Sequence, residues 1–304
     1  MTLPRASSAR GTPSRGATIT RMGQGTMIKV GCMSLSYKDV FPSGDMTLEG
    51  LLETAYEMRL DGVDLHTSAF SSTDDAALRE IRRACHRRGL AISYLAVSNN
   101  FGKTDDALRS DIELTKKWTD LAQRMGVPLV RIFAAWLPKD EPEDAVWARM
   151  FDAIREVVHY AAERDVVIGL HNHNHGCVTR TGDDVLRILD TIDSPYFSHI
   201  LDTGQYVGSP GASGADRDAD AEEQLYNSIA TSAHRAVHVR AKFYRVASGV
   251  EEWLDYPRIL RTLKSVDYNG WMSVVYEGWD AEPSATAVPK AVSHLRTLLS
   301  EADM

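Results

Sequence analysis

The sequence predicts an α/β protein of the (β/α)8 TIM-barrel class. From Ile28 onward, short β-branched and apolar runs alternate with longer segments of helical period, which is the pattern of βαβ units. Eight such strand and helix pairs can be counted, and eight is the number that closes a barrel. An open doubly wound sheet is the alternative, but it usually has fewer strands and often carries a glycine-rich GxGxxG turn that this sequence lacks.

Each predicted strand is a short apolar run, and each predicted helix fills the interval to the next run. The strands are expected at Ile28–Met33, Gly62–Thr67, Ala91–Val97, Val127–Ala135, Val166–Asn172, Phe197–Thr203, Ala236–Phe243 and Trp271–Gly278. The helices are expected at Leu48–Arg59, Thr73–Arg88, Thr104–Met125, Glu141–Arg164, Gly182–Ile192, Ala221–His234, Tyr256–Val266 and Ala287–Ser300. Several helices are followed by a glycine, at Gly89, Gly126 and Gly270, where a left-handed residue can turn the chain back toward the sheet.

Residues 1–26 differ in composition from the rest of the chain. They are rich in Ser, Thr, Gly and Arg and contain no acidic residue, so we expect a disordered extension before a single barrel domain over residues 27–304. A transit peptide, or an upstream start codon with translation from Met22 or Met27, would each account for such an extension. The length of 304 residues suits one barrel, since this fold commonly takes about 250 residues.

The composition narrows the class of protein. A content of 43% hydrophobic and 25% charged residues is ordinary for a globular protein. The net charge of -8 argues against a protein that binds the phosphate backbone, so nucleic acid is not an expected partner. No apolar run approaches the ~18 residues that cross a bilayer, so no membrane association is expected. Cys32, Cys85 and Cys177 have no paired spacing, which favours a reducing, cytoplasmic location.

Polar residues at the carboxyl ends of barrel strands face the substrate, and this rule selects the candidate site. Buried charges at such positions are costly unless they are paired or bound to a metal, so their convergence would itself indicate function. The candidates are His66, Asn99, Asn100, Arg131, Trp136, His171, Asn172, His173, Asp202, Gln205, His238, Arg240, Lys242 and Glu277.

The densest cluster is a histidine repeat at the fifth strand. His171, His173 and His175 occupy alternate positions and can point the same way, which suits a divalent metal or a proton relay. Alternatively, one imidazole enters the site while the others bond the loop backbone. Asp202 ends an apolar strand directly before a glycine turn, although a turn or helix-capping role is the alternative. Glu277 ends the last strand in the same way, and a purely structural role explains it less well.

These strand ends resemble those of the sugar-phosphate isomerase/epimerase superfamily, whose barrels are xylose-isomerase-like. In that superfamily the fifth strand ends in a pattern like Leu-Glu-Asn-His, the sixth in Asp-Thr-Gly-His, the seventh in His-x-His-x-Lys-Asp and the eighth in a Glu. This chain has Leu170–His173, Asp202–Gln205, His238–Lys242 and Glu277 at the matching places. The likeness extends over residues 28–299. It implies a divalent cation held by Glu, Asp, His and Glu from those four strands.

The chain departs from this pattern at two ligand positions. Asp202 and Glu277 are retained, but His171 replaces the first Glu and Arg240 replaces the ligand His. An arginine is permanently protonated and cannot donate a lone pair to a metal. One hypothesis is a rearranged metal site of His171, Asp202 and Glu277, for which Mn²⁺ would suit the mixed nitrogen and oxygen ligands. The other is a metal-free site in which Arg240 and Lys242 replace the cation.

The resemblance implies chemistry next to a sugar carbonyl. A base removes a carbon-bound proton, positive charge stabilises the enediolate, and an acid returns the proton or expels a leaving group. We therefore expect an isomerase, epimerase or lyase acting on a sugar or keto-sugar. The expected catalytic residues are Glu277, His171, His173 and Lys242, and the expected substrate-binding residues are His66, Arg131, Arg240, Gln205 and Trp136.

The sequence predicts the class of substrate more closely than it predicts a protein partner. The expected substrate is a small sugar, a polyol ketone or a keto-glycoside, and a homo-oligomer or a hetero-oligomer is compatible with the fold. One alternative is a non-catalytic barrel that binds a sugar or another subunit. The motivation is that this chain lacks the Glu and the His that other members of the superfamily have at the two ligand positions.

Overall fold

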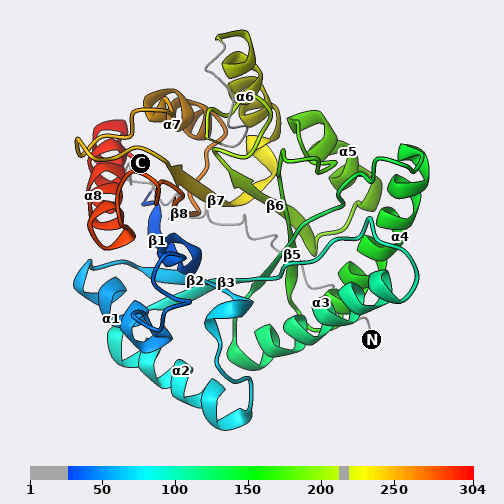
Figure 1. Cartoon of the computed structure of the whole chain (residues 1–304), viewed down its shortest axis with the longest axis horizontal. Helices are drawn as coiled ribbons and strands as arrows, with labels where there is room; N and C mark the ends of the chain where they lie inside the picture. Colours follow the sequence, from blue (N-terminus) through cyan, green and yellow to red (C-terminus); the bar gives the residue numbers. More distant parts are fainter. Residues whose placement is uncertain (1–26, 212–218) are drawn as a thin grey trace, which may run out of the picture.

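The computed structural model describes residues 27–211 and 219–304, and its eight parallel strands close into a barrel (Figure 1). Each strand pairs with its neighbours in sequence, and β8 closes the barrel by pairing with β1. The predicted fold class is confirmed, and the open sheet is excluded. The extension expected at residues 1–26 lies outside the described residues.

The strands form the inner ring and the helices the outer ring. The strands are β1 (Lys29–Met33), β2 (Gly62–His66), β3 (Ala91–Ala96), β4 (Leu129–Ile132), β5 (Val167–His171), β6 (Phe197–Asp202), β7 (Ala236–Phe243) and β8 (Trp271–Tyr276). The α-helices are α1 (Leu48–Glu57), α2 (Asp75–Arg88), α3 (Asp105–Met125), α4 (Glu143–Ala162), α5 (Gly182–Ile192), α6 (Ala219–Ser232), α7 (Tyr256–Ser265) and α8 (Ser284–Ala302). Short 3-10 helices follow β1, β2 and α6, at η1 (Ser34–Tyr37), η2 (Thr67–Ala69) and η3 (Ala233–Arg235). Among the helices of the described residues, none is long and apolar enough to span a membrane.

Most element bounds agree with the sequence prediction to within a few residues, and β4 is the largest departure among the strands. It covers only Leu129–Ile132 of the predicted Val127–Ala135. The side chain of Asn99 accepts from the backbone N–H of Phe133 at 2.9 Å and donates to its carbonyl at 2.8 Å. Because a side chain thus takes the place of a neighbouring strand, regular pairing stops there.

Two of the three predicted glycine turns are confirmed. Gly89 and Gly126 end α2 and α3 in the left-handed conformation, with φ of 66° and 73°. The third prediction was wrong, because the left-handed residue after α7 is Asp267, with φ of 55°, and not Gly270. A Cβ at Gly270 would lie 2.7 Å from the hydroxyl of Tyr268, so glycine is needed there for close approach instead.

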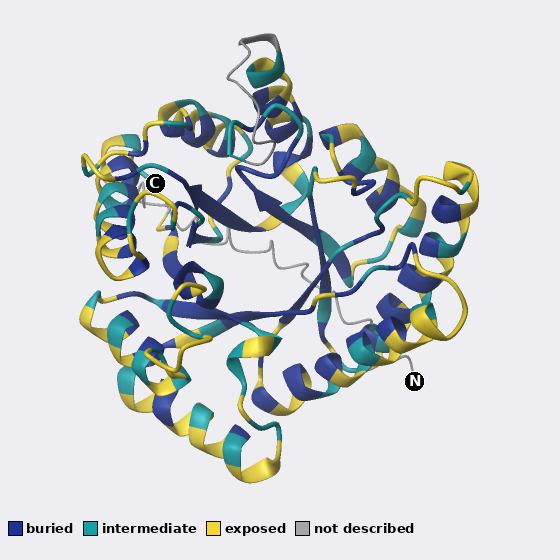
Figure 2. Cartoon of the chain, in the orientation of Figure 1, coloured by how far each residue is buried: buried dark blue, intermediate teal, exposed yellow. Residues whose placement is uncertain are grey.

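Buried residues line the strands and the inner faces of the helices, while exposed residues cover the outer helix faces (Figure 2). Inside the barrel the apolar filling is small, comprising Met33, Tyr94, Ala96, Leu129, Ile200 and Val275. Much of the remaining interior is polar. Successive inward positions of β7 carry His238, Arg240 and Lys242, all 3% exposed or less. Such a row of basic groups requires buried carboxylates to balance it.

Candidate active site

A fully buried carboxylate, Asp202 at the end of β6, is the centre of the polar cluster. Its Oδ2 lies 2.9 Å from Arg240 Nε and 3.3 Å from both Lys242 Nζ and His171 Nε2. Burial alone would raise the pKa of Asp202, but the nearby Lys242, His171 and Arg240 hold it well below its usual range. The carboxylate therefore stays ionised and anchors two cations.

The backbone around Asp202 is held by one side chain that directly follows β5 and by its own turn. Asn172 accepts from the N–H of Asp202 at 2.8 Å and donates to its carbonyl at 3.0 Å. The N–H of Gly204 donates to Asp202 Oδ1 at 3.0 Å. These bonds fix the carboxylate where β6 turns outward, which explains the Asp-Thr-Gly order after an apolar strand.

The second carboxylate, Glu277, follows β8 and lies partly open to solvent, with 32% of its side chain exposed. Its Oε1 is 2.7 Å from Lys242 Nζ, and its Oε2 accepts from Gln205 Nε2 at 3.4 Å. Lys242 is fully buried, so its ammonium group bridges a buried carboxylate, Asp202, and one that a substrate can reach. Glu277 is thereby the carboxylate of the cluster that solvent reaches.

An aromatic wall lies at the ends of β4 and β5. The ring of Phe133 lies 4.9 Å from Trp136, 5.1 Å from His171 and 5.3 Å from His173, measured between ring centres. Burial lowers the pKa of His173 to about 3, helped by His175 and Lys242, and burial lowers the pKa of His171 well below its usual value. Both imidazoles are therefore neutral at physiological pH, and they offer hydrogen bonds without positive charge.

Arg131 and His66 lie beside this cluster with partners of their own. The guanidinium of Arg131 donates to the carbonyl of Val97 at 3.0 Å and packs 4.1 Å from the ring centre of Phe133. The two ring nitrogens of His66 lie 2.7 and 2.8 Å from the hydroxyls of Ser68 and Ser98. His66 is therefore already satisfied, and a substrate hydroxyl would have to replace one of these serines.

Unused hydrogen-bonding atoms concentrate in the predicted site. Buried polar atoms without a hydrogen-bond partner among the described residues include Arg131 Nε, His171 Nδ1, His173 Nδ1, Gln205 Oε1 and Lys242 Nζ. The contact between Lys242 and Glu277 is an ion pair that lacks the angle of a hydrogen bond. Unsatisfied buried polar atoms are rare in folded proteins, so such a group at strand ends is typical of a ligand site.

Two residues of the cluster were missed by the sequence reasoning. The hydroxyl of Tyr94, on β3, accepts from Arg240 Nη1 inside the barrel. Phe133 belongs to the aromatic wall. It follows Arg131 by two residues, and alternate residues of a strand share one face, so this spacing could have indicated its place in the cluster. Tyr94 had no such signal, because it lies within an apolar run.

The donor set does not fit a divalent ion. The three expected ligands His171, Asp202 and Glu277 do lie in one region, but Arg240 and Lys242 are paired with the two carboxylates. Among residues 27–211 and 219–304, no group of three or more His, Cys, Asp or Glu side chains is arranged to hold a metal. A cation placed between the two carboxylates would meet the ammonium of Lys242, which repels it and has no free lone pair.

Comparison with known proteins identifies the family of this barrel. The profile of the xylose isomerase-like TIM barrel family matches residues 52–298. The chain belongs to this family. Its similar proteins include the L-ribulose-5-phosphate 3-epimerase UlaE of Salmonella paratyphi A, 24% identical over 284 residues that cover 88% of this chain and 95% of that protein. The same epimerase from Escherichia coli K12 is 22% identical over 282 residues, with the same coverage.

Solved structures of sugar epimerases share the fold. The 3-keto-D-glucoside 4-epimerase YcjR from E. coli superposes with a TM-score of 0.68 and 17% identity, covering 89% of this chain and 99% of that chain. A D-allulose 3-epimerase from Methylomonas sp. superposes with a TM-score of 0.67 and 18% identity, covering 90% and 99%. At these identities the likeness establishes the barrel, and the chemistry must be argued from the site.

Proposed function

We propose that this barrel is a sugar epimerase or isomerase in which Lys242 and Arg240 supply the positive charge that polarises the substrate carbonyl. The observation that carries the proposal is the buried ammonium of Lys242, 2.7 Å from Glu277 and 3.3 Å from Asp202, with unused hydrogen-bonding capacity. In a site shielded from water, a fixed cation stabilises a developing oxyanion far better than it would in solvent.

Glu277 is the proposed base. It is the carboxylate of the pair that solvent reaches, and it removes the proton from the carbon next to the carbonyl. The electron pair of that C–H bond then forms the enediolate, whose oxygen is stabilised by Lys242. Return of the proton by Glu277 to the neighbouring carbon gives the isomer. In the proposed epimerisation, a water molecule protonates the same carbon from the other face, and the hydroxide that this leaves takes the proton from Glu277.

His171 and His173 are proposed as hydrogen-bond partners of the substrate oxygens. Both rings are neutral because of burial, and each has an unpartnered Nδ1. A neutral imidazole can donate to an enediolate oxygen without first being protonated, as happens in triosephosphate isomerase. Arg131, Gln205 and Trp136 are proposed to contact the hydroxyls and the face of the sugar. His66 is proposed to reach a substrate hydroxyl only in place of Ser68 or Ser98, to which its ring nitrogens are bonded.

The substrate is proposed to be a ketose, a ketose phosphate or a keto-glycoside. The names of the similar proteins support epimerisation of such molecules, and they favour return of the proton over loss of a leaving group. Asp202 is proposed to act through Lys242 and Arg240, because it is fully buried beneath them. It holds the two cations in place without reaching the substrate.

Proton exchange in D₂O tests the proposal directly. The full-length protein is incubated with a panel of ketoses, ketose phosphates and 3-keto-glucosides, and NMR follows replacement of the carbon-bound hydrogen by deuterium. Glu277→Gln is expected to slow exchange by about 10²–10⁴-fold, because it removes the base. Lys242→Met is expected to lower kcat more than it changes KM, since the cation acts on the transition state.

The same assay separates the enzyme from a non-catalytic barrel. A sugar that binds, as calorimetry would show, but never exchanges its carbon-bound hydrogen would support the binding-protein alternative. Exchange that continues at the wild-type rate in Glu277→Gln would refute the assigned base.

A further inference from the structure

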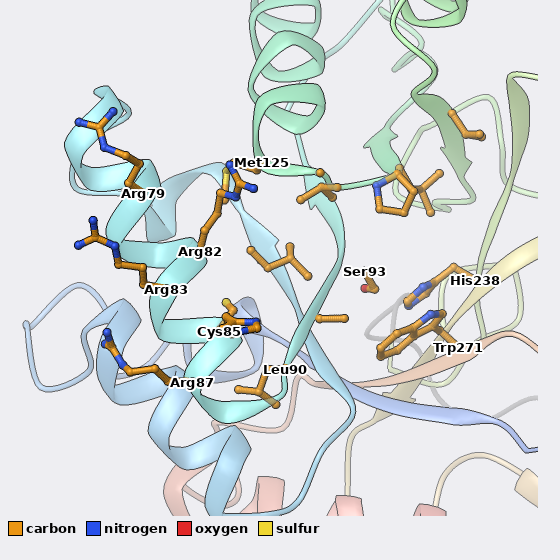
Figure 3. Close-up of a pocket in the computed structure, with 18 of the residues that line it drawn as sticks. Arg79, Arg82, Arg83, Cys85, Arg87, Leu90, Ser93, Met125, His238 and Trp271 are labelled. Atoms are coloured by element: carbon orange, nitrogen blue, oxygen red, sulfur yellow. The ribbon is translucent and has the colours of Figure 1, made fainter.

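A groove of about 1000 Å³ opens at the amino-terminal end of the barrel, opposite the candidate active site. One wall consists of the first residues of four strands, Ala91, Leu129, Val167 and Trp271. The other wall is helix α2 (Figure 3). No role assigned to the active site uses this part of the molecule.

The helix wall is strongly basic. Arg79, Arg82, Arg83, His86 and Arg87 all line the groove from α2, all are exposed, and no acidic side chain is among the described lining residues. Figure 3 shows Arg82 on the side of α2 that faces Met125, while Arg79, Arg83 and Arg87 extend from the opposite side of the helix, away from His238 and Trp271. This concentration of positive charge stands out in a chain whose net charge is -8.

Ordinary structural roles account for only part of this charge. His86 and Arg87 lie in the last turn of α2, where basic residues complement the helix dipole. Arg82 donates to the carbonyl of Arg124, in the last turn of α3, at 3.3 Å, whereas Arg79 lies too early in α2 for the dipole effect. Glu80 contacts Arg83 at 3.5 Å and Arg87 at 3.9 Å. These pairs are exposed, and exposed pairs bind weakly, so the guanidinium groups remain free to exchange partners.

The strand side of the groove is apolar. Leu90, Val127 and Leu129 are buried there, while Val237 is 45% exposed and Trp271 is half-buried. A cavity of this size with an apolar wall is typical of small-molecule sites. The groove therefore offers apolar surface and positive charge side by side.

We propose that this groove is a second binding site, which takes an amphipathic organic anion. Such a ligand joins a phosphate, sulfonate or carboxylate to an apolar body. The planar guanidinium groups of α2 match the oxygens of these anions, and the apolar body covers Val237 and Trp271. Residues 1–26 of the chain are a poorer occupant, because they carry arginines and no acidic residue.

Two fluorescent probes that differ by one sulfonate group test the site on the full-length protein. The anion is 8-anilinonaphthalene-1-sulfonate, and N-phenyl-1-naphthylamine is its neutral counterpart. The double variant Arg82→Gln/Arg83→Gln is compared with a matched control, Arg109→Gln/Arg155→Gln, whose arginines are exposed on α3 and α4 outside the groove. Unchanged circular dichroism and melting temperature verify the fold of each variant.

The wild type and the control are expected to bind the sulfonate about 10-fold more tightly than the neutral probe, as expected for two exposed charge contacts. The Arg82→Gln/Arg83→Gln variant is expected to lose that preference while keeping its affinity for the neutral probe. Val237→Glu, at an exposed position, is expected to weaken binding of both probes.

Equal sulfonate affinity in the two double variants would overturn the proposal. Sulfonate binding that strengthens after removal of residues 1–26 would also overturn it, since the groove would then hold the chain's own segment. Sulfonate binding that survives Val237→Glu but disappears in Glu277→Gln would place the probe in the barrel mouth, with the same consequence.

Discussion

Replacing Asp202 by Asn tests the ion-pair centre on which the account of the site depends. The substitution keeps the shape of the side chain but removes a fully buried negative charge that faces Arg240 at 2.9 Å and Lys242 at 3.3 Å. Breaking a buried pair by removing one partner costs about 3–5 kcal/mol, because the remaining charges are left uncompensated. For a domain of this size, that loss lowers the melting temperature by roughly 6–12 °C.

A second substitution distinguishes charge balance from general damage to the core. Lys242→Met removes one of the two cations that lose the Asp202 charge in Asp202→Asn. The double variant should therefore lose less stability than the sum of the two single losses. Coupling energies for groups in one such network are about 0.5–3 kcal/mol. Melting temperatures and urea denaturation curves of the four proteins measure this cycle. Strictly additive losses would refute the idea that Asp202 serves to compensate the cations.

Two further predictions concern stability and the position of Lys242. Burial lowers the pKa of His173 to about 3 and of His199 to about 4, whereas unfolded histidine titrates near 6.5. Below pH ~6.5 the unfolded chain therefore binds more protons than the folded protein, and stability falls as the pH falls. Each such histidine should lower the free energy of unfolding by about 1.4 kcal/mol per pH unit, down to its folded pKa. A melting temperature that stays constant from pH 7 to 5 would contradict this. Gly204→Ala places a Cβ 2.5 Å from Lys242 Cγ, and it should slow deuterium exchange by about 10²-fold through displacement of the ammonium. Gly50→Ala, whose Cβ has no neighbour closer than 3.4 Å, is the control that should leave exchange unchanged.

The fold could be predicted because its signals are local. Short apolar runs at strand spacing and glycines such as Gly89 and Gly126 act within a few residues of themselves, and the structure agrees with both. The end of β4 could not be predicted, since it depends on the side chain of Asn99, which comes from the preceding loop. The left-handed turn at Asp267 was missed because glycine is the usual residue at such a position.

The convergence of the strand-end side chains could be predicted from the sequence, but the contacts among them could not. The strand-end rule brought Asp202, Lys242 and Glu277 to one place, as the structure has them. Whether those carboxylates bind a metal or balance cations depends on which atoms meet, and the sequence left both open. The position of Tyr94 inside the barrel, bonded to Arg240, likewise follows only from side-chain packing across distant strands.

Metal content combined with proton exchange tests the central claim most directly. The protein is purified without a histidine tag, its metals are measured by elemental analysis, and deuterium exchange of a turned-over sugar is followed before and after treatment with EDTA. If Lys242 and Arg240 provide the positive charge, the protein holds well under one equivalent of any divalent metal, and exchange continues unchanged in EDTA. About one equivalent of metal that is lost in Asp202→Ala, together with exchange that stops in EDTA and returns with Mn²⁺, would contradict the account.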